Sequence, residues 1–182
     1  MSSLGEKIVT GIPPVEWPVV STAEMAAVVQ QLATNNTSVY DRSHPLGTFE
    51  EQFRNLVGRK YSVSFNSGTS ALLGAYYGAG LGEGDEVIVP SYTFWATVTP
   101  LVRLGAVPVF ADIDESTLTL CPKSVESRIT PSTKAVVVNH TWGNPADLAA
   151  LEAVCKRHGL LLIEDASHGH GALYNNRPIG SF

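Results

Sequence analysis

The sequence has few cysteines, no long apolar run and no cluster of basic residues. Its two cysteines, Cys121 and Cys155, lack C-x-x-C spacing, which argues against a zinc site and favours a reducing compartment. No apolar stretch reaches the roughly 18–20 residues that a membrane-spanning helix needs, and the first residues lack the apolar core of a signal peptide. We therefore predict a cytoplasmic protein that does not span a membrane.

The net charge is −5 and the basic residues are scattered. Such a surface has no strong positive field, so neither nucleic acid nor an anionic membrane is an expected partner. The hydrophobic share of 44% and the charged share of 16% are ordinary for a globular protein. At 182 residues the chain is long enough for one domain with a real core.

The order of the predicted elements indicates the fold class. Residues 1–20 are rich in Pro and Gly and are expected to form an irregular arm. Capping boxes at Ser21 and Thr48 predict two helices, the second ending at Gly58. Strands and helices then alternate, which favours an α/β fold with a three-layer, doubly wound, mostly parallel sheet. The predicted strands cover residues 61–65, 85–89, 107–111, 134–139 and 160–165, and the predicted helices cover 70–79, 93–104, 123–129 and 144–157. The helix at 93–104 is expected to kink at Pro100, and the last helix is expected to have Asn144 as its N-cap and to end at Gly159.

The strand at 160–165 runs from apolar residues into Glu164 and Asp165. A continuous apolar run of this kind is typical of a buried parallel strand. Because ligands bind beyond the carboxyl ends of such strands, we expect Asp165 in a ligand cleft. Glu164 points to the other face by strand alternation, so the two are not expected to form a catalytic pair. Alternatives for Asp165 are a structural turn cap and a metal ligand.

A second candidate element is the turn Asn66-Ser67-Gly68-Thr69-Ser70 between a strand and a helix. Gly68 lets the backbone approach an anion closely, and the N–H groups of Thr69 and Ser70, with the Thr69 hydroxyl, would bind a phosphate. The alternative is an ordinary turn with a Ser/Thr cap, and the pattern is neither a Rossmann fingerprint nor a P-loop. A ligand that needs both a phosphate site and a carboxylate for a protonated ring nitrogen is pyridoxal phosphate (PLP).

An aromatic segment and a histidine pair complete the candidates. Phe94 and Trp95 follow the strand at 85–89, where a ring can stack on a flat cofactor or pack between helix and sheet. His168 and His170 flank Gly169 just after Asp165, but no third ligand with suitable spacing stands out, so no metal site is expected. We expect His168 to contact a ring or form a hydrogen bond and His170 to be structural.

Several segments occur together in the order and spacing of a known family. From about Pro45 to its end, the chain resembles the DegT/DnrJ/EryC1/StrS group of sugar aminotransferases, which are fold type I PLP enzymes. The resemblance rests on Asn66-Ser67-Gly68-Thr69-Ser70-Ala71-Leu72, Pro90-Ser91-Tyr92-Thr93-Phe94, Gly105-Ala106-Val107-Pro108-Val109-Phe110-Ala111-Asp112-Ile113-Asp114, His140-Thr141-Trp142-Gly143-Asn144-Pro145-Ala146-Asp147 and Glu164-Asp165-Ala166-Ser167-His168-Gly169-His170-Gly171-Ala172.

The resemblance implies a role for each matching residue. Gly68 and Thr69 would hold the cofactor phosphate, and Phe94, rather than Trp95, would stack on the pyridine ring. Asp165 would pair with the pyridine nitrogen, and His168 would lie beside the ring and its phenolic oxygen. Family members pass an amino group from glutamate or glutamine to a keto-sugar nucleotide or a related cyclic ketone, and they are dimers with active sites at the subunit interface.

The chain departs from the family in two respects, the Schiff-base lysine and the small C-terminal domain. The family's Schiff-base lysine follows the segment that matches Gly180-Ser181-Phe182, and no lysine here has that context, so no catalytic residue is assigned. We expect residues 21–182 to form a partial PLP-binding large domain without the small C-terminal domain. The chain would then be a truncation, one half of a split enzyme completed by a C-terminal chain, or a non-catalytic remnant. Dehydratase relatives carry His in place of the lysine. A phosphate-binding α/β domain without catalysis is the alternative from another class.

Overall fold

The computed structural model describes residues 18–38 and 40–182, and its contacts divide the chain into one unit up to Ser43 and another from His44. The first unit contains the helix α1 (Thr22–Ala33). Its predicted capping box is confirmed, because Ser21 Oγ accepts the Glu24 N–H at 3.2 Å and the Ser21 N–H donates to Glu24 Oε2 at 2.6 Å. Most of the predicted N-terminal arm, residues 1–17, lies outside the described residues.

The second unit is built on a parallel sheet of four strands. These are β1 (Glu86–Pro90), β2 (Val107–Ala111), β3 (Thr133–Asn139) and β4 (Leu161–Asp165), in the order β2-β1-β3-β4. Pro90 pairs with Ala111, and Asn139 pairs with Asp165. The carboxyl ends of the strands therefore lie along one edge of the sheet, as the predicted α/β class requires.

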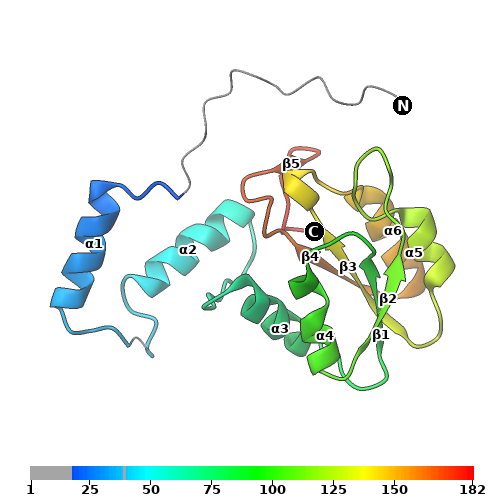
Figure 1. Cartoon of the computed structure of the whole chain (residues 1–182), viewed down its shortest axis with the longest axis horizontal. Helices are drawn as coiled ribbons and strands as arrows, with labels where there is room; N and C mark the ends of the chain where they lie inside the picture. Colours follow the sequence, from blue (N-terminus) through cyan, green and yellow to red (C-terminus); the bar gives the residue numbers. More distant parts are fainter. Residues whose placement is uncertain (1–17, 39) are drawn as a thin grey trace, which may run out of the picture. The chain divides into compact units, whose positions relative to one another are not determined.

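Helices cover both faces of this sheet and make the three predicted layers (Figure 1). On one face, α3 (Gly68–Gly78) and α4 (Thr99–Arg103) pack on Val87 and Val89. On the other, α5 (Pro122–Arg128) and α6 (Leu148–His158) pack on Ile88. Alternate residues of a strand thus enter two separate cores, which is the pattern of a strand buried on both faces.

The remaining elements are short. The helix α2 (Leu46–Val57) ends at Gly58, as predicted. Two 3-10 turns, η1 (Trp95–Thr97) and η2 (Thr141–Gly143), follow β1 and β3, and the strands β5 (Leu173–Tyr174) and β6 (Arg177–Pro178) form a hairpin. No helix in the described part of the chain combines the length and apolar character needed to cross a bilayer.

Two predictions before the sheet were wrong. Residues 61–65 are not a strand. Ser64 in this segment bonds to a helix instead of a neighbouring strand, because Glu50 of α2 accepts both its N–H and its hydroxyl. Thr48 does not cap α2, which begins at Leu46 without a side-chain cap. The Thr48 hydroxyl contacts His44 Nδ1.

Two helix predictions after β1 also need correction. The segment 93–104 is not one helix with a kink but η1 followed by α4, with Pro100 in the first turn of α4. A proline is suited to that position because the first N–H groups of a helix have no partner in it. Asn144 does not cap α6: its side chain donates to the Thr117 carbonyl, and Asp147 is the cap.

Candidate cofactor site

A pocket of about 230 Å³ brings the predicted site residues together. It lies where the ends of β3 and β4 meet the start of α3 and the turn before η1. Gly68, Thr69, Phe94, Asp165 and His168 all line it, although they are spread over a hundred positions of the sequence. The other lining residues are Leu72, Ala96, Asn139 and Ser167.

Asp165 enters this pocket from the end of β4, and its residue is buried, at 5% exposure. The Ser167 N–H and hydroxyl donate to Oδ1 at 3.2 and 2.6 Å, and the Thr97 hydroxyl donates to Oδ2 at 2.7 Å. An ionised carboxylate has about four acceptor sites. Oδ2 therefore retains room for one more donor from a ligand in the pocket.

The Asp165 side chain is held in place by hydrogen bonds that involve η1. Thr97 is fully buried, and because its only proton goes to Asp165, it must accept the Thr93 hydroxyl 2.9 Å away. The Tyr76 hydroxyl donates to the Thr97 carbonyl at 2.8 Å and ties η1 to α3. Burial and, secondarily, the negative charge of Asp165 raise the pKa of Tyr76, so the phenol remains a donor at neutral pH.

The first turn of α3 differs in part from the sequence prediction. Ser67 is its cap, and Ser67 Oγ accepts the Ser70 N–H at 3.1 Å. That N–H is therefore already engaged, contrary to the prediction that it would bind a phosphate. The N–H groups of Gly68 and Thr69 have no acceptor within the described residues, as expected for the start of a helix. These two groups can bind an anion in the pocket.

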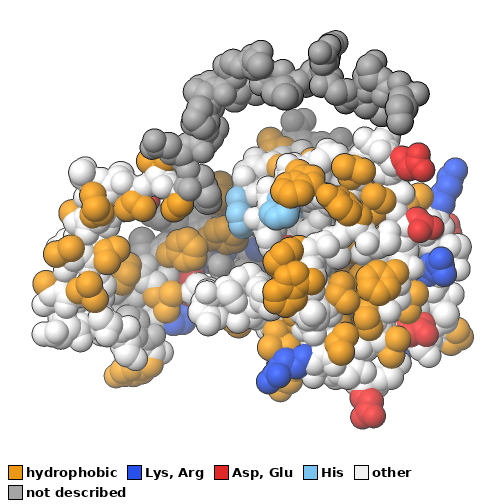
Figure 2. Space-filling view, in the orientation of Figure 1, with side chains coloured by type: hydrophobic (Ala, Val, Ile, Leu, Met, Phe, Trp, Pro, Cys, Tyr) orange, Lys and Arg blue, Asp and Glu red, His pale blue; other side chains and the backbone are white. Residues whose placement is uncertain are grey.

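The two aromatic side chains after β1 are both exposed. Phe94 is 56% and Trp95 62% exposed, and their rings are tilted by 48° with centroids 5.3 Å apart. Neither is packed between helix and sheet, and only Phe94 lines the pocket. Figure 2 shows hydrophobic side chains gathered on the viewer's face of the second unit, with charged side chains mainly at its margin. Because Phe94 is more than half exposed and lines the pocket, its ring is available to a flat ligand.

His168 and His170 point to different surroundings. His168 lines the pocket, and its imidazole stacks on the Trp142 indole, with centroids 5.3 Å apart and planes 11° apart. His170 meets the Phe53 ring edge-on at 5.7 Å and does not line the pocket. The roles expected for the two histidines stay predictions, and only His168 is placed where it could contact a ligand in this pocket.

Sequence reasoning missed Asn139 and Ser167. Asn139 ends β3 beside Asp165 in the sheet register, so the rule that ligands lie beyond strand ends was enough to find it. Its Oδ1 accepts the Thr141 hydroxyl at 2.7 Å. Ser167 supports Asp165 from two residues ahead, a local turn contact that Asp commonly makes.

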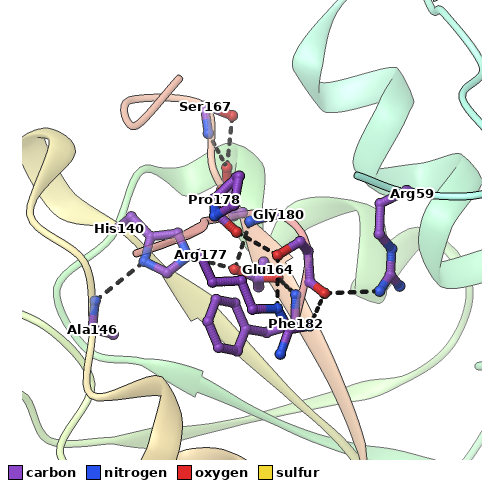
Figure 3. A network of polar contacts seen from close by, with 11 residues as sticks. Arg59, His140, Ala146, Glu164, Ser167, Arg177, Pro178, Gly180 and Phe182 are labelled. Atoms are coloured by element: carbon purple, nitrogen blue, oxygen red, sulfur yellow. Dashed lines mark hydrogen bonds and ion pairs between the residues drawn. The ribbon is translucent and has the colours of Figure 1, made fainter. Parts of the chain in front are cut away.

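Glu164 belongs to a separate network on the other face of β4 (Figure 3). The Gly180 and Phe182 N–H groups donate to its two oxygens, each at 2.7 Å. His140 Nδ1 accepts the Ala146 N–H at 3.2 Å, so the ring proton is assigned to Nε2, which donates to Glu164 at 3.1 Å. Burial raises the pKa of Glu164, but these donors outweigh it and hold the pKa below its usual value.

Comparisons with known proteins find similar sequences and structures. The model of the DegT/DnrJ/EryC1/StrS aminotransferase family matches residues 20–182. The spore coat polysaccharide biosynthesis protein SpsC of Bacillus subtilis (strain 168) is 40% identical over 168 residues, which are 92% of this chain and 42% of that protein.

Solved structures are similar over the same region. The aminotransferase from Psychrobacter cryohalolentis is 36% identical with a TM-score of 0.88, and the match covers 92% of this chain and 42% of that one. The GDP-4-keto-6-deoxy-D-mannose-3-dehydratase of E. coli, with bound hydrated PLP, is 29% identical with a TM-score of 0.81, covering 90% and 43%. This chain spans less than half the length of these relatives.

Proposed function

Because this chain belongs to the DegT/DnrJ/EryC1/StrS aminotransferase family, we propose that it is the N-terminal portion of a PLP-dependent aminotransferase. The amino donor is glutamate or glutamine, and the acceptor is a keto-sugar nucleotide or a related cyclic ketone. One observation carries the proposal: a single pocket contains unengaged helix N–H groups, an exposed aromatic ring and a buried carboxylate with a free acceptor site. PLP has a phosphate, a flat ring and a ring nitrogen, so this set of groups fits it.

Each lining residue has a role in this proposal. The Gly68 and Thr69 N–H groups bind the phosphate at the start of α3. Phe94 stacks on the pyridine ring, and His168 lies beside that ring. Asp165 Oδ2 accepts the ring N–H and keeps its proton in place. When bound, the cofactor supplies an electron sink for the amino transfer, and Asp165 makes that sink effective by holding the proton on the ring nitrogen.

Among the described residues that line the pocket, none carries an amine for covalent capture of the cofactor. Within residues 18–38 and 40–182, no lysine lines this pocket. We therefore propose that this chain binds PLP but does not catalyse transamination alone. A lysine from a complementing C-terminal chain would complete an aminotransferase site. The likeness to the E. coli dehydratase supports a second candidate, a dehydratase-type reaction completed by a histidine.

We also propose a cellular compartment and an oligomeric state for the protein. Two cysteines without a disulfide, Cys121 and Cys155, fit a reducing compartment, so we place the protein in the cytoplasm. Exposed apolar side chains favour association with a second copy or a complementing chain. The largest in the second unit include Phe65, Tyr77, Tyr92, Phe94, Trp95 and Trp142.

A PLP titration of the purified chain, followed by absorbance and tryptophan fluorescence, tests the function. We expect saturable binding, with no turnover above a PLP-only control when glutamate and keto-sugar nucleotides are added. Binding of inorganic phosphate without PLP binding would instead support a phosphate-binding domain. Turnover by the chain alone would contradict the proposed need for an added lysine. Light scattering on the same sample tests association, and a well-behaved monomer would contradict it.

A further inference from the structure

The turn η2 contacts His168 in two places, although it follows a different strand. The Trp142 indole stacks on the imidazole, and the Gly143 backbone lies so close to the His168 carbonyl that a Cβ there would be 3.2 Å from that oxygen. Trp142 itself does not line the pocket. Its influence on a ligand in the pocket must therefore pass through His168.

Trp142 adopts a backbone conformation that a bulky residue rarely takes. Its φ of 55° and ψ of 26° lie in the left-handed region, where the Cβ crowds the backbone. Burial does not explain a tryptophan here, because the residue is 72% exposed. Its indole instead has two directed contacts, the stack on His168 and an Nε1–H donated to Tyr92 Oη at 3.2 Å. Strained residues of this kind concentrate at functional sites.

His168 needs such support. It is exposed, in the loop between β4 and β5, and no hydrogen bond to its imidazole is found within the described residues. An exposed side chain on a loop samples several rotamers on a fast timescale. The parallel indole face restricts the imidazole to one plane at the pocket wall.

We propose that Trp142 is a positioning residue, which fixes the imidazole plane of His168 for contact with the ring of a bound cofactor. Tyr92 in turn fixes the indole through the Nε1–H bond. The cofactor contact rests on the function proposed above, whereas the orientation of His168 does not. A merely structural Trp142 would stabilise the turn, so its replacement would lower stability.

The test compares Trp142→Asn, Trp142→Phe and Tyr92→Phe in the 182-residue chain. Asn tolerates the left-handed conformation, so Trp142→Asn removes the stack and relieves the backbone. Trp142→Phe retains a stacking ring, and Tyr92→Phe removes only the acceptor hydroxyl. Tyr61→Leu is the control, since Tyr61 is an exposed aromatic residue that does not line the pocket. His168→Gln identifies the His168 ring signals in the NMR spectrum.

In Trp142→Asn, we expect an unchanged or higher melting temperature, loss of the indole ring-current shift of the His168 protons, and a PLP Kd about three- to tenfold weaker. Trp142→Phe should retain part of that shift and more of the affinity, and Tyr92→Phe should lie between wild type and Trp142→Asn in both. A lower melting temperature with unchanged His168 signals and PLP affinity would overturn the proposal. Wild-type protein that shows the ring-current shift but binds no PLP would overturn the cofactor function and leave the positioning of His168 supported.

Discussion

Glu164 and Asp165 are adjacent in β4, yet their carboxylates lie on opposite faces of the sheet. Glu164 accepts hydrogen bonds from His140, Gly180 and Phe182 on one face. Asp165 accepts hydrogen bonds from Thr97 and Ser167 on the other, at the pocket. Because successive side chains of a strand alternate, one acidic pair both anchors the segment that ends the chain and provides the carboxylate of the candidate site.

Glu164→Gln should destabilise the chain while leaving the pocket intact. The amide nitrogen cannot accept the N–H groups that one carboxylate oxygen now accepts, so at least one buried donor loses its partner. We expect a loss of about 1–3 kcal/mol in the free energy of unfolding. Urea unfolding at pH 7 measures this, with the exposed Glu115→Gln as control. Equal stability of the two variants would contradict the anchoring role.

Glu164→Gln should also change how the free energy of unfolding depends on pH in the acid range. The folded-state pKa of Glu164 lies below its ordinary value of 4.5, so the ionised carboxylate contributes stability above that value. This contribution falls as the pH drops through the lowered folded-state pKa. We expect the stability gap between wild type and Glu164→Gln to narrow in that acid range, as measured by urea midpoints at successive pH values. If the urea midpoints of wild type and Glu164→Gln differ by the same amount at every pH, ionisation of Glu164 does not contribute to the pH dependence of stability.

Asp165→Asn should weaken PLP binding with little change in fold. The amide preserves the shape but removes the negative charge that would pair with the ring N–H. A hydrogen bond to a charged group contributes about 1.5–3 kcal/mol, which corresponds to a Kd about ten- to 150-fold weaker. The PLP titration measures it, and Glu115→Gln controls for loss of an exposed carboxylate. Equal affinity of wild type and Asp165→Asn would assign Asp165 a structural role.

The sheet was predictable where a strand is buried on both faces. The apolar runs within 85–89 and 134–139 identify β1 and β3, the central strands, because strands covered on both faces consist mostly of apolar residues. The edge strands β2 and β4 were also predicted, although they are only partly buried. The strand predicted at 61–65 from its alternating pattern was wrong, since such a pattern does not reveal whether a neighbouring strand is there to pair with it. The caps at Ser21 and Gly159 were predicted correctly because they depend on residues close in sequence. The predicted cap Asn144 was wrong: Asp147 caps α6, because the Asn144 side chain bonds to Thr117, which is distant in sequence.

In the candidate site, too, the features that depend on local sequence were predictable and the long-range contacts were not. Gly68, Thr69, Phe94, Asp165 and His168 were named from strand ends and family motifs, and the structure gathers them in one pocket. The supports behind them were not predictable, because they join segments through folding alone. The Thr97 hydroxyl reaches Asp165 across 68 positions of the sequence, and nothing local to either residue indicates this contact.

Thr97→Val tests that support directly. The substitution replaces a fully buried hydroxyl by a methyl group of similar size, so Asp165 Oδ2 loses its donor and Thr93 loses its acceptor. We expect a loss of about 1–3 kcal/mol in stability, together with weaker PLP binding. Thr97→Ser keeps the hydroxyl and should retain the PLP affinity even where the lost methyl lowers stability. Urea unfolding and the PLP titration separate these two effects.

Gly143→Ala and Gly159→Ala form a matched pair for the turn at His168. Both glycines have left-handed backbones, with φ of 82° and 68°, so each alanine incurs about 1–2 kcal/mol of backbone strain. Only at Gly143 would the added Cβ meet an obstacle, the His168 carbonyl oxygen at 3.2 Å; at Gly159 no atom lies within 4 Å. That carbonyl belongs to backbone, which cannot move aside as a flexible side chain can.

We therefore expect Gly143→Ala to lower the free energy of unfolding by more than Gly159→Ala, and to perturb the His168 NMR signals, which Gly159→Ala should leave unchanged. Thermal and urea unfolding compare the stabilities on one scale. If the two variants lose the same stability and neither changes His168, the close approach of η2 to this loop does not constrain the pocket. A larger loss for Gly143→Ala together with shifted His168 signals would establish that the turn after β3 sets the position of the histidine after β4.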